Sequence, residues 1–171
     1  MAAKGPGRVE RTADAAPALR PWEERDLPLL ERASEDEYVA LIERLPVPFD
    51  SGRGRGWIAT RRETEWAVVA DGETVGGAGY ATRHVPGMAE VGYWIAADRR
   101  GAGLATAALE LVVERAFAAG IERVQAVVEP WNVASQRVLE KGGFEREGLL
   151  RGYASYAEER RRDVLLYARL A

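Results

Sequence analysis

A glycine-rich segment in the middle of the chain has the composition of a phosphate site. It reads Arg-Arg-Gly-Ala-Gly-Leu-Ala-Thr over residues 99–106, follows an apolar, strand-like stretch at 91–95 and opens a helix-like stretch at 102–119. Glycine lets the backbone approach a ligand closely, and the first turn of a helix offers free N–H groups in a field that favours negative charge. Arg100 adds a permanent positive charge that can bind phosphate oxygens through two N–H groups. The segment therefore predicts a binding site for a phosphate-bearing ligand.

Three kinds of phosphate site follow a strand and begin a helix. A Walker loop requires Gly-Lys-Ser or Gly-Lys-Thr, which the chain lacks. A dinucleotide fingerprint requires a third small residue after Gly101 and Gly103, where the sequence continues Leu-Ala-Thr. Glu129, at the end of the next strand, could act as the ribose-binding acid of a dinucleotide site, although it lies rather late in the sequence for that role. Only about forty residues follow it, too few for the remaining strands and helices of a doubly wound sheet. The third pattern, Arg-x-x-Gly-x-Ala, is met by Arg100, Gly103 and Ala105.

This third pattern resembles the coenzyme A pyrophosphate loop of the GNAT acetyltransferases, and the downstream sequence is similar to the same family. Asn-Val-Ala-Ser at 132–135, followed by Arg-Val-Leu-Glu-Lys-Gly-Gly-Phe at 137–144, resembles a segment of its RimJ/RimL-like branch. The last strand-like stretch, 163–170, and the opening Leu-Arg-Pro-Trp at 19–22 with Asp26 are similar to the two ends of that branch.

The resemblance implies transfer of an acetyl or other acyl group from acetyl-CoA to a primary amine. The amine would attack the thioester directly while both substrates are bound, and it would be a protein N-terminus or a small-molecule amine. Two alternatives stay open. One is a GNAT-like module that binds acyl-CoA as a sensor or scaffold with little turnover, and the other is a nucleotide-binding oxidoreductase. Release of coenzyme A in the presence of amines, against binding of NAD, separates them.

The resemblance also assigns cofactor contacts around the loop. Backbone N–H groups along 100–106 would meet the pyrophosphate of coenzyme A, and exposed backbone at Trp94 and Ile95 would bind the pantetheine arm and supply the oxyanion donor. Asn132 has two interpretations, as the N-cap of the next helix and as a contact of the pantetheine arm, and both can hold. The expected cofactor-binding residues are Trp94, Ile95, Arg100, Gly101, Ala102, Gly103, Leu104, Ala105, Thr106 and Asn132.

Two residues are candidates for proton transfer. By resemblance Ser135 would protonate the leaving thiolate, and its place is also that of an ordinary first-turn helix residue. Glu90, at the start of the strand before the loop, is the candidate base from its strand position, with a solvated edge carboxylate as the alternative. Some relatives carry a glutamate that falls on Ala154 here, so this chain lacks that carboxylate. His84 has suitable chemistry, but a neighbouring Pro-Gly turn favours a surface position.

These residues need a sheet to position them, and the hydrophobic pattern indicates a β-meander followed by β-α-β-α-β-β. Asp-Gly at 71–72 is a strong hairpin signal between two of the strands. Buried strands in this order are typical of an α/β domain with a mixed sheet. The expected strands are 18–22, 65–70, 74–83, 89–95, 123–128, 145–153 and 161–169.

Capping residues indicate where the helices begin. Asp26 is placed to cap a helix that begins near Leu27, and Ser34–Glu37 resembles a capping box for the next one. The glycine–arginine run at 51–56 is interpreted as a loop that leads into a helix near Trp57. Two further helices are expected over 102–119, before Gly120, and from Asn132 to Gly142.

The resemblance implies the GNAT fold. This is a single α/β domain over residues 18–171, with a mixed, mostly antiparallel central sheet of about seven strands and about four flanking helices. Two strands would splay apart at the cofactor site. Residues 1–17, rich in Ala, Gly, Pro and charge, are interpreted as a mobile N-terminal tail.

The composition excludes several kinds of site and partner. With no cysteine and one histidine, disulfides, a cysteine nucleophile and thiolate zinc are excluded, and no metal is expected. A net charge of −3 and a pI of about 5.4 give no general attraction to nucleic acid or an anionic membrane. No apolar run approaches the roughly 20 residues that span a bilayer, and the N-terminus lacks a signal peptide's apolar core. A cytoplasmic protein is therefore expected, with the acceptor and the oligomeric state, monomer or homodimer, left open.

Overall fold

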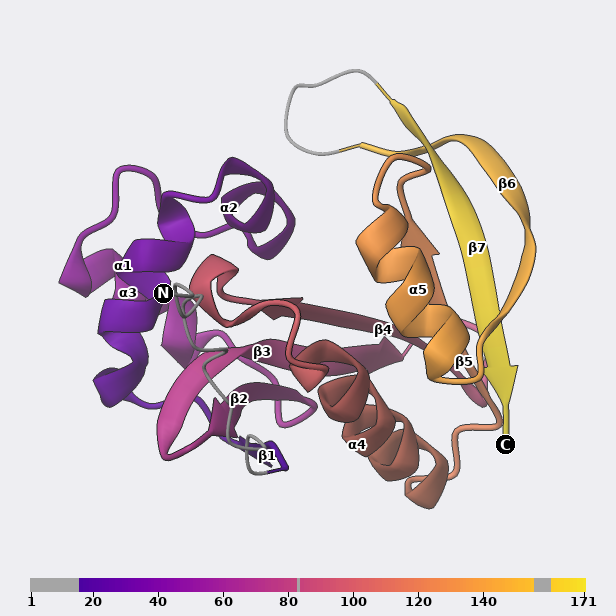
Figure 1. Ribbon diagram of the computed structural model, residues 1–171, viewed down its shortest axis with the longest axis horizontal. Helices are drawn as coiled ribbons and strands as arrows, with labels where there is room; N and C mark the ends of the chain where they lie inside the picture. The colour runs from indigo at the N-terminus through magenta and orange to yellow at the C-terminus, as the bar shows by residue number, and fades with distance from the viewer. Residues whose placement is uncertain (1–15, 83, 156–160) are drawn as a thin grey trace, which may run out of the picture.

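A single seven-stranded sheet organises the protein (Figure 1). The computed structural model describes residues 16–82, 84–155 and 161–171, so the expected tail falls almost wholly on residues outside the described part. The strand order is β1-β2-β3-β4-β5-β7-β6. Neighbouring described strands are antiparallel except β4 and β5, which confirms a mixed, mostly antiparallel sheet. The strands are β1 Ala18–Arg20, β2 Glu65–Ala70, β3 Glu73–Thr82, β4 Met88–Ile95, β5 Arg123–Val128, β6 Glu145–Ala154 and β7 Arg162–Leu170.

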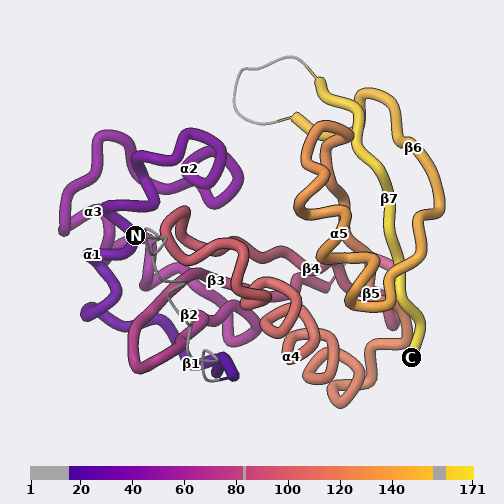
Figure 2. Tube along the Cα trace, in the orientation of Figure 1, coloured from indigo at the N-terminus to yellow at the C-terminus, as the bar shows by residue number. Residues whose placement is uncertain are grey.

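Strands β4 and β5 diverge soon after they meet. They pair only through residues 88–90 of β4 and 123–125 of β5. β4 still pairs with β3 as far as Ile95, and β5 with β7 as far as Val128. Beyond Glu90, two strand edges without a partner strand in the described part of the chain therefore face each other. Figure 2 shows the result, since β5–β7 stand at a steep angle to β1–β4, and the expected splay is confirmed.

Five α-helices, rather than about four, flank the sheet in the described residues. α4 and α5 share one hydrophobic core with the strands, which includes Leu109 and Leu139. α1–α3 form a second core that includes Leu30 and Trp57. The helices are α1 Leu27–Ser34, α2 Glu37–Glu43, α3 Ser51–Ala59, α4 Leu104–Ala118 and α5 Val133–Lys141, with short 3₁₀ turns η1 Glu24–Asp26 and η2 Ala97–Arg99.

Side chains along β4 alternate between these two cores. Val91 and Ile95 pack in the core of α4 and α5, whereas Trp94 packs in the core of α1–α3. Successive residues of a strand point to opposite faces. Tyr93 therefore shares the face of α4 and α5, and Glu90 shares the face of Trp94. This alternation decides which of the predicted site residues can meet.

Helix α3 begins at Ser51, where a loop was expected. Asp50 caps this helix, because its Oδ1 accepts a hydrogen bond from the backbone N–H of Arg53 at 2.9 Å. Gly54 has a packing role, since a Cβ there would lie 2.7 Å from the Phe49 ring. Glycine disfavours helix, and here the cap and the tertiary contact outweigh that preference.

The capping box expected at Ser34–Glu37 is wrong. Ser34 is the last residue of α1, and Asp36 is the N-cap of α2. The Oδ1 atom of Asp36 accepts from the backbone N–H groups of Tyr38 and Val39, each at 3.1 Å. Helix α1 continues to Ser34 and packs against α2. This packing places the N-cap of α2 at Asp36, two residues after the expected Ser34.

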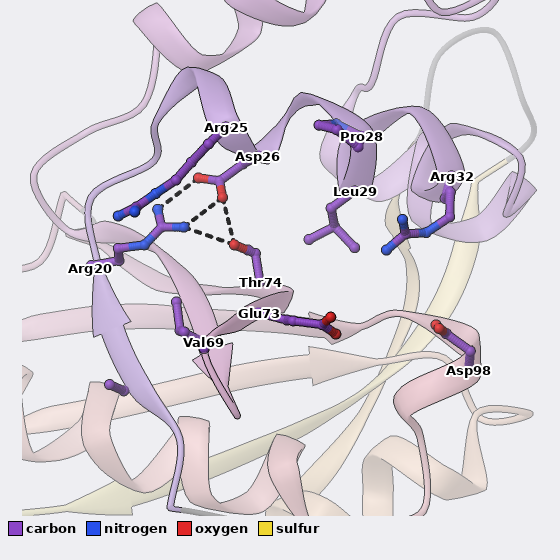
Figure 3. Close-up of a pocket in the computed structure, with 12 residues that line it drawn as sticks. Arg20, Arg25, Asp26, Pro28, Leu29, Arg32, Val69, Glu73, Thr74 and Asp98 are labelled. Atoms are coloured by element: carbon purple, nitrogen blue, oxygen red, sulfur yellow. Dashed lines mark hydrogen bonds and ion pairs between the residues drawn. The ribbon is translucent and has the colours of Figure 1, made fainter.

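Asp26 is the N-cap residue of α1, which begins at Leu27 as expected, but its buried side chain makes no capping hydrogen bond to α1. Its Oδ1 lies 2.6 Å from Arg20 Nη2 and accepts a hydrogen bond from Thr74 Oγ1 at 2.6 Å (Figure 3). Its Oδ2 accepts from the backbone N–H of Glu23. Burial opposes ionisation, but these donors lower the pKa of Asp26 overall. The cluster lines a groove of about 840 Å³, and none of the predicted site residues lines that groove.

Candidate functional site

A cavity of about 500 Å³ lies where the end of β4 meets α2, α4 and α5. It gathers most of the predicted cofactor residues from two distant parts of the sequence. Ala102 is an exception, because it packs against the hydrophobic core. The predicted residues that line the cavity are Trp94, Ile95, Arg100, Gly101, Gly103, Leu104, Ala105, Thr106, Asn132 and Ser135.

Two glycines shape the loop before α4. Gly101 and Gly103 have φ angles of 81° and 83°, in the left-handed region that favours glycine. A Cβ at either position would meet no atom within 4 Å among the described residues, so the space in front of the loop is open. α4 begins at Leu104, two residues later than expected, and Gly103 provides no side-chain cap. The first N–H groups of α4 are therefore available to a ligand.

The guanidinium of Arg100 is held by protein partners. Its Nε donates to the carbonyl oxygen of Ile95 at 2.8 Å, and its Nη2 donates to Oδ2 of Asp36 at 2.7 Å. Burial opposes ionisation of Asp36, but Arg100 and the α2 backbone N–H groups lower its pKa overall. Arg100 thus ties the N-terminus of α2 to the loop. Among the described residues, three further cations line the cavity, Arg99, Arg137 and Lys141. Arg137 and Lys141 were not predicted, although their i, i+4 spacing on one helix was a usable signal.

Asn132 is the N-cap of α5, as one of its two interpretations predicts. Its Oδ1 accepts a hydrogen bond from the backbone N–H of Ser135 at 3.1 Å. Asn132 also lines the cavity, so a contact with the pantetheine arm stays a prediction.

Ser135 meets a partner that the sequence did not reveal. The hydroxyl oxygens of Ser135 and Tyr93 are 2.9 Å apart, and Tyr93 also donates to the Ser135 carbonyl oxygen at 3.2 Å. This contact joins β4 to α5 across the splay. Burial raises the pKa of Tyr93 to about 12, so its hydroxyl stays protonated at neutral pH. Strand alternation was the available signal for Tyr93. It predicts that Tyr93 points to the face opposite that of its neighbour Trp94, which packs in the core of α1–α3.

Glu90 lies on the opposite face of the sheet from Ser135. It is the last β4 residue paired with β5, and its Oε2 accepts from Gln125 Nε2 at 3.2 Å. It lines a second cavity of about 130 Å³, to which Trp94 also belongs. The structure therefore does not bring Glu90 and Ser135 into one cavity, and β4 stands between them.

The other residues considered for proton transfer contribute nothing to either cavity. Ala154 ends β6, where its backbone pairs with that of Arg162, and its methyl side chain supplies no carboxylate. His84 is exposed in the turn between β3 and β4. In the residues that the structure describes, no group of three or more His, Cys, Asp or Glu side chains could hold a metal ion, and no helix is long and apolar enough to cross a membrane.

Glu43, at the end of α2, makes stability depend on pH. Burial and the nearby Glu65 raise the pKa of Glu43 from 4.5 to about 7, against the opposing effect of Arg61. Because the folded-state pKa is above the unfolded value, the folded state loses stability as pH rises from about 4.5 through 7. We expect Glu43→Gln to remove this loss, so that its urea midpoint exceeds that of the parent by more at pH 8 than at pH 5. Glu63→Gln, at an exposed position, is the control, and a constant difference between Glu43→Gln and parent across this range would contradict the expectation.

Comparison with known proteins extends these observations. An acetyltransferase (GNAT) domain family matches residues 18–145. The chain is 34% identical over 121 residues to the uncharacterized N-acetyltransferase YoaA of Bacillus subtilis, covering 70% of this chain and 65% of that protein. It is 30% identical over 109 residues to the L-methionine sulfoximine/L-methionine sulfone acetyltransferase of Pseudomonas aeruginosa PAO1, covering 59% of this chain and 63% of that one. The matches thus span less than two thirds of these relatives.

Solved structures are similar over more of their length. RimJ of Mycobacterium smegmatis, in complex with CoA-disulfide, has a TM-score of 0.78 and 30% identity, covering 91% of this chain and 82% of that one. RimL, a ribosomal L7/L12 alpha-N-protein acetyltransferase in complex with coenzyme A, has a TM-score of 0.75, covering 93% and 96%. At 20% identity RimL shares the fold.

Proposed function

The chain belongs to the GNAT acetyltransferase family, and from this premise we propose that it transfers an acetyl group from acetyl-CoA to a primary amine. The observation that carries the proposal is the loop at 100–106, in which two left-handed glycines lead into an uncapped helix at the wall of a cavity. This is the arrangement that binds a pyrophosphate through backbone N–H groups. Each such bond to a charged group contributes about 1.5–3 kcal/mol.

The edge of β4 in the splay is proposed to hold the pantetheine arm. Arg123 N–H donates to the carbonyl oxygen of Gly87, and Ala96 N–H donates to that of Val75 on β3. Because these directions alternate along a strand, the odd-numbered residues of β4 direct their backbone groups toward β5. We therefore assign the arm to the backbone of Tyr93 and Ile95, with Trp94 as a wall of the cavity. The Ile95 carbonyl accepts from Arg100, and we assign the Ile95 N–H, which is directed toward β5, as the oxyanion donor.

The placement of Glu90 and Ser135 fits a reaction that crosses the sheet. In the proposed reaction the amine arrives from the face of Glu90 and loses a proton, and its nitrogen forms a bond to the acetyl carbon. The carbon–sulfur bond breaks, and the thiolate takes a proton from Ser135 on the other face. The second proton that the nitrogen loses as the amide forms passes through solvent and restores the Ser135 hydroxyl. At pH 7.5 removal of the proton costs about 4 kcal/mol for a lysine side chain and well under 1 kcal/mol for an α-amine, so an α-amine needs only a weak base.

Thiol release tests the proposed function. We expect free coenzyme A to accumulate when the protein is mixed with acetyl-CoA and a panel of peptides, amino-acid derivatives, polyamines and aminoglycosides. Ala154, which supplies no carboxylate at the end of β6, favours a second candidate, a binding module with little turnover. Acetyl-CoA that raises the melting temperature, without thiol release for any amine, would support that module and contradict the enzyme.

We expect Ser135→Ala to lower kcat about tenfold, equivalent to about 1.4 kcal/mol in the barrier. The effect is modest because a thiol is a good leaving group, with a pKa near 8.5. Tyr93→Phe, which removes the hydroxyl contact at 2.9 Å, should lower kcat less. The dissociation constant of acetyl-CoA should stay within about twofold of the parent in both, since a protonating group acts late in the reaction. Ser34→Ala, whose hydroxyl contacts only α1 backbone in the described structure, is the control, and parental kcat in Ser135→Ala would leave Ser135 a structural residue.

A further inference from the structure

The second cavity, on the α1–α3 face of β4, combines aromatic walls with carboxylates. Its volume is about 130 Å³, room for a small organic group. Trp22 and Trp57 meet edge to face at a centroid distance of 5.1 Å, and Trp22 stacks on Trp94 at 6.2 Å. The carboxylates that line the same cavity are Glu43, Glu65 and Glu90.

Two glycines, Gly77 on β3 and Gly92 on β4, shape this cavity in different ways. At Gly77 a Cβ would lie 2.7 Å from Trp94 Nε1 and 2.8 Å from the Trp22 ring, so that glycine allows the indoles to pack on the sheet. At Gly92 a Cβ would meet no atom within 4 Å among the described residues. Gly92 lines the cavity and shares the face of Glu90 and Trp94. The missing side chain of Gly92 therefore leaves space that a ligand can fill.

Two hydrogen-bond donors at this cavity lack acceptors. Trp94 is 5% exposed, and its Nε1 is buried without a hydrogen-bond partner in the described structure. The Nε of Arg61 is also buried without a hydrogen-bond partner in the described structure. The nearest carboxylate oxygen, on Glu65, is 3.7 Å away. Buried N–H groups almost always have a partner. These donors point to a ligand that brings an oxygen.

The charge of the cavity favours a cation. Arg61 is the cation among its lining residues, against three carboxylates. It lies 3.9 Å from Glu43 and 4.0 Å above the Trp57 ring. The surplus of carboxylates persists when Glu43 is protonated, and indole faces also attract cations. The cavity therefore favours binding of an ammonium group over binding of a carboxylate.

We propose that this cavity is the acceptor subsite, and that it selects a cationic amine with a neutral carbonyl oxygen beside the ammonium group, as in an amino-acid amide. Trp94 Nε1 would donate to the carbonyl oxygen, and the carboxylates would hold the ammonium. The inference rests on the proposed function, because the amine reaches the thioester through the β4–β5 gap. Glu90 lines the cavity at the point where that gap begins. One ammonium proton passes to Glu90, and the amine formed then attacks as described above.

Three small probes test the class of acceptor. Alaninamide carries an ammonium and a carbonyl, alanine adds a carboxylate charge, and ethylamine lacks the oxygen. Binding is followed by the fluorescence of the five tryptophans without acetyl-CoA, and turnover by thiol release. We expect alaninamide to bind at least tenfold more tightly than alanine or ethylamine, with kcat/KM in the same order. Equal affinities, or a preference for alanine or ethylamine, would overturn the proposed class.

Two variants test the location. Gly92→Leu should weaken alaninamide binding at least tenfold and leave the dissociation constant of acetyl-CoA unchanged. Gly148→Leu, on β6 with equally open space at its Cβ, should change neither. Trp94→Phe should reduce the affinity for alaninamide to that for ethylamine.

The outcomes separate this inference from the proposed function. Parental alaninamide affinity in Gly92→Leu, or no fluorescence change in the parent with any probe, would overturn the subsite. If other amines still released thiol, the proposed acetyltransferase activity would be supported, and only the assignment of this cavity as the acceptor subsite would fail.

Discussion

Replacing Gly103 with valine should weaken acetyl-CoA binding at least a hundredfold while the protein still folds. The valine side chain would stand in the open space before α4, where the pyrophosphate is proposed to meet the backbone. Loss of two bonds to a charged group, at about 1.5 kcal/mol each, corresponds to at least a hundredfold weaker binding. A φ angle of 83° also strains any branched residue, so we expect a loss of stability of about 1–2 kcal/mol.

Gly120→Val is the matched control for that experiment. Gly120 has a φ angle of 84° and equally open space, but it lies past the other end of α4 and outside the cavity wall. Both variants should lose similar stability, and Gly120→Val should keep parental affinity in calorimetry. At 100 times its dissociation constant, acetyl-CoA should stabilise the parent by about 2.7 kcal/mol, and Gly103→Val at the same concentration by at most about 0.4 kcal/mol. Equal affinity in the two variants would show that the loop is not the cofactor site.

Glu90→Gln should lower kcat by up to about tenfold at pH 7. An amide cannot take the ammonium proton, and only about one in seven molecules of an α-amine with a pKa near 7.8 is free at that pH. The loss should shrink as pH rises, because an α-amine with a pKa near 7.8 is mostly free at pH 9. The measurement is kcat from pH 6.5 to 9 at saturating acetyl-CoA, whose affinity should not change.

Glu110→Gln, on the exposed side of α4, controls for the loss of one negative charge. It should keep the parental pH profile. Parental kcat for Glu90→Gln at both pH 6.5 and pH 9 would remove Glu90 from the mechanism.

Local patterns carried most of the prediction of the fold. The hydrophobic pattern and the turn signals located the strands, and β5 agrees with the expected 123–128 at both ends. The N-cap role of Asn132 was also predictable, because its partner Ser135 is three residues away. The errors occur where a distant contact competes with a local preference. The Asp26 side chain pairs with Thr74, 48 residues away, in place of a capping hydrogen bond to α1.

The sequence by itself determined the glycine turn before α4, the proposed cofactor loop, because a left-handed glycine turn before a helix depends on neighbouring residues alone. Only the tertiary structure decided where the catalytic candidates lie relative to each other and which residues they contact. The Tyr93–Ser135 contact spans 42 residues, and the Arg100–Asp36 contact spans 64. The splay of β4 from β5 and the alternation of β4 place Glu90 and Ser135 on opposite faces. Such placement follows from the packing of two cores on one sheet, which no short stretch of sequence encodes.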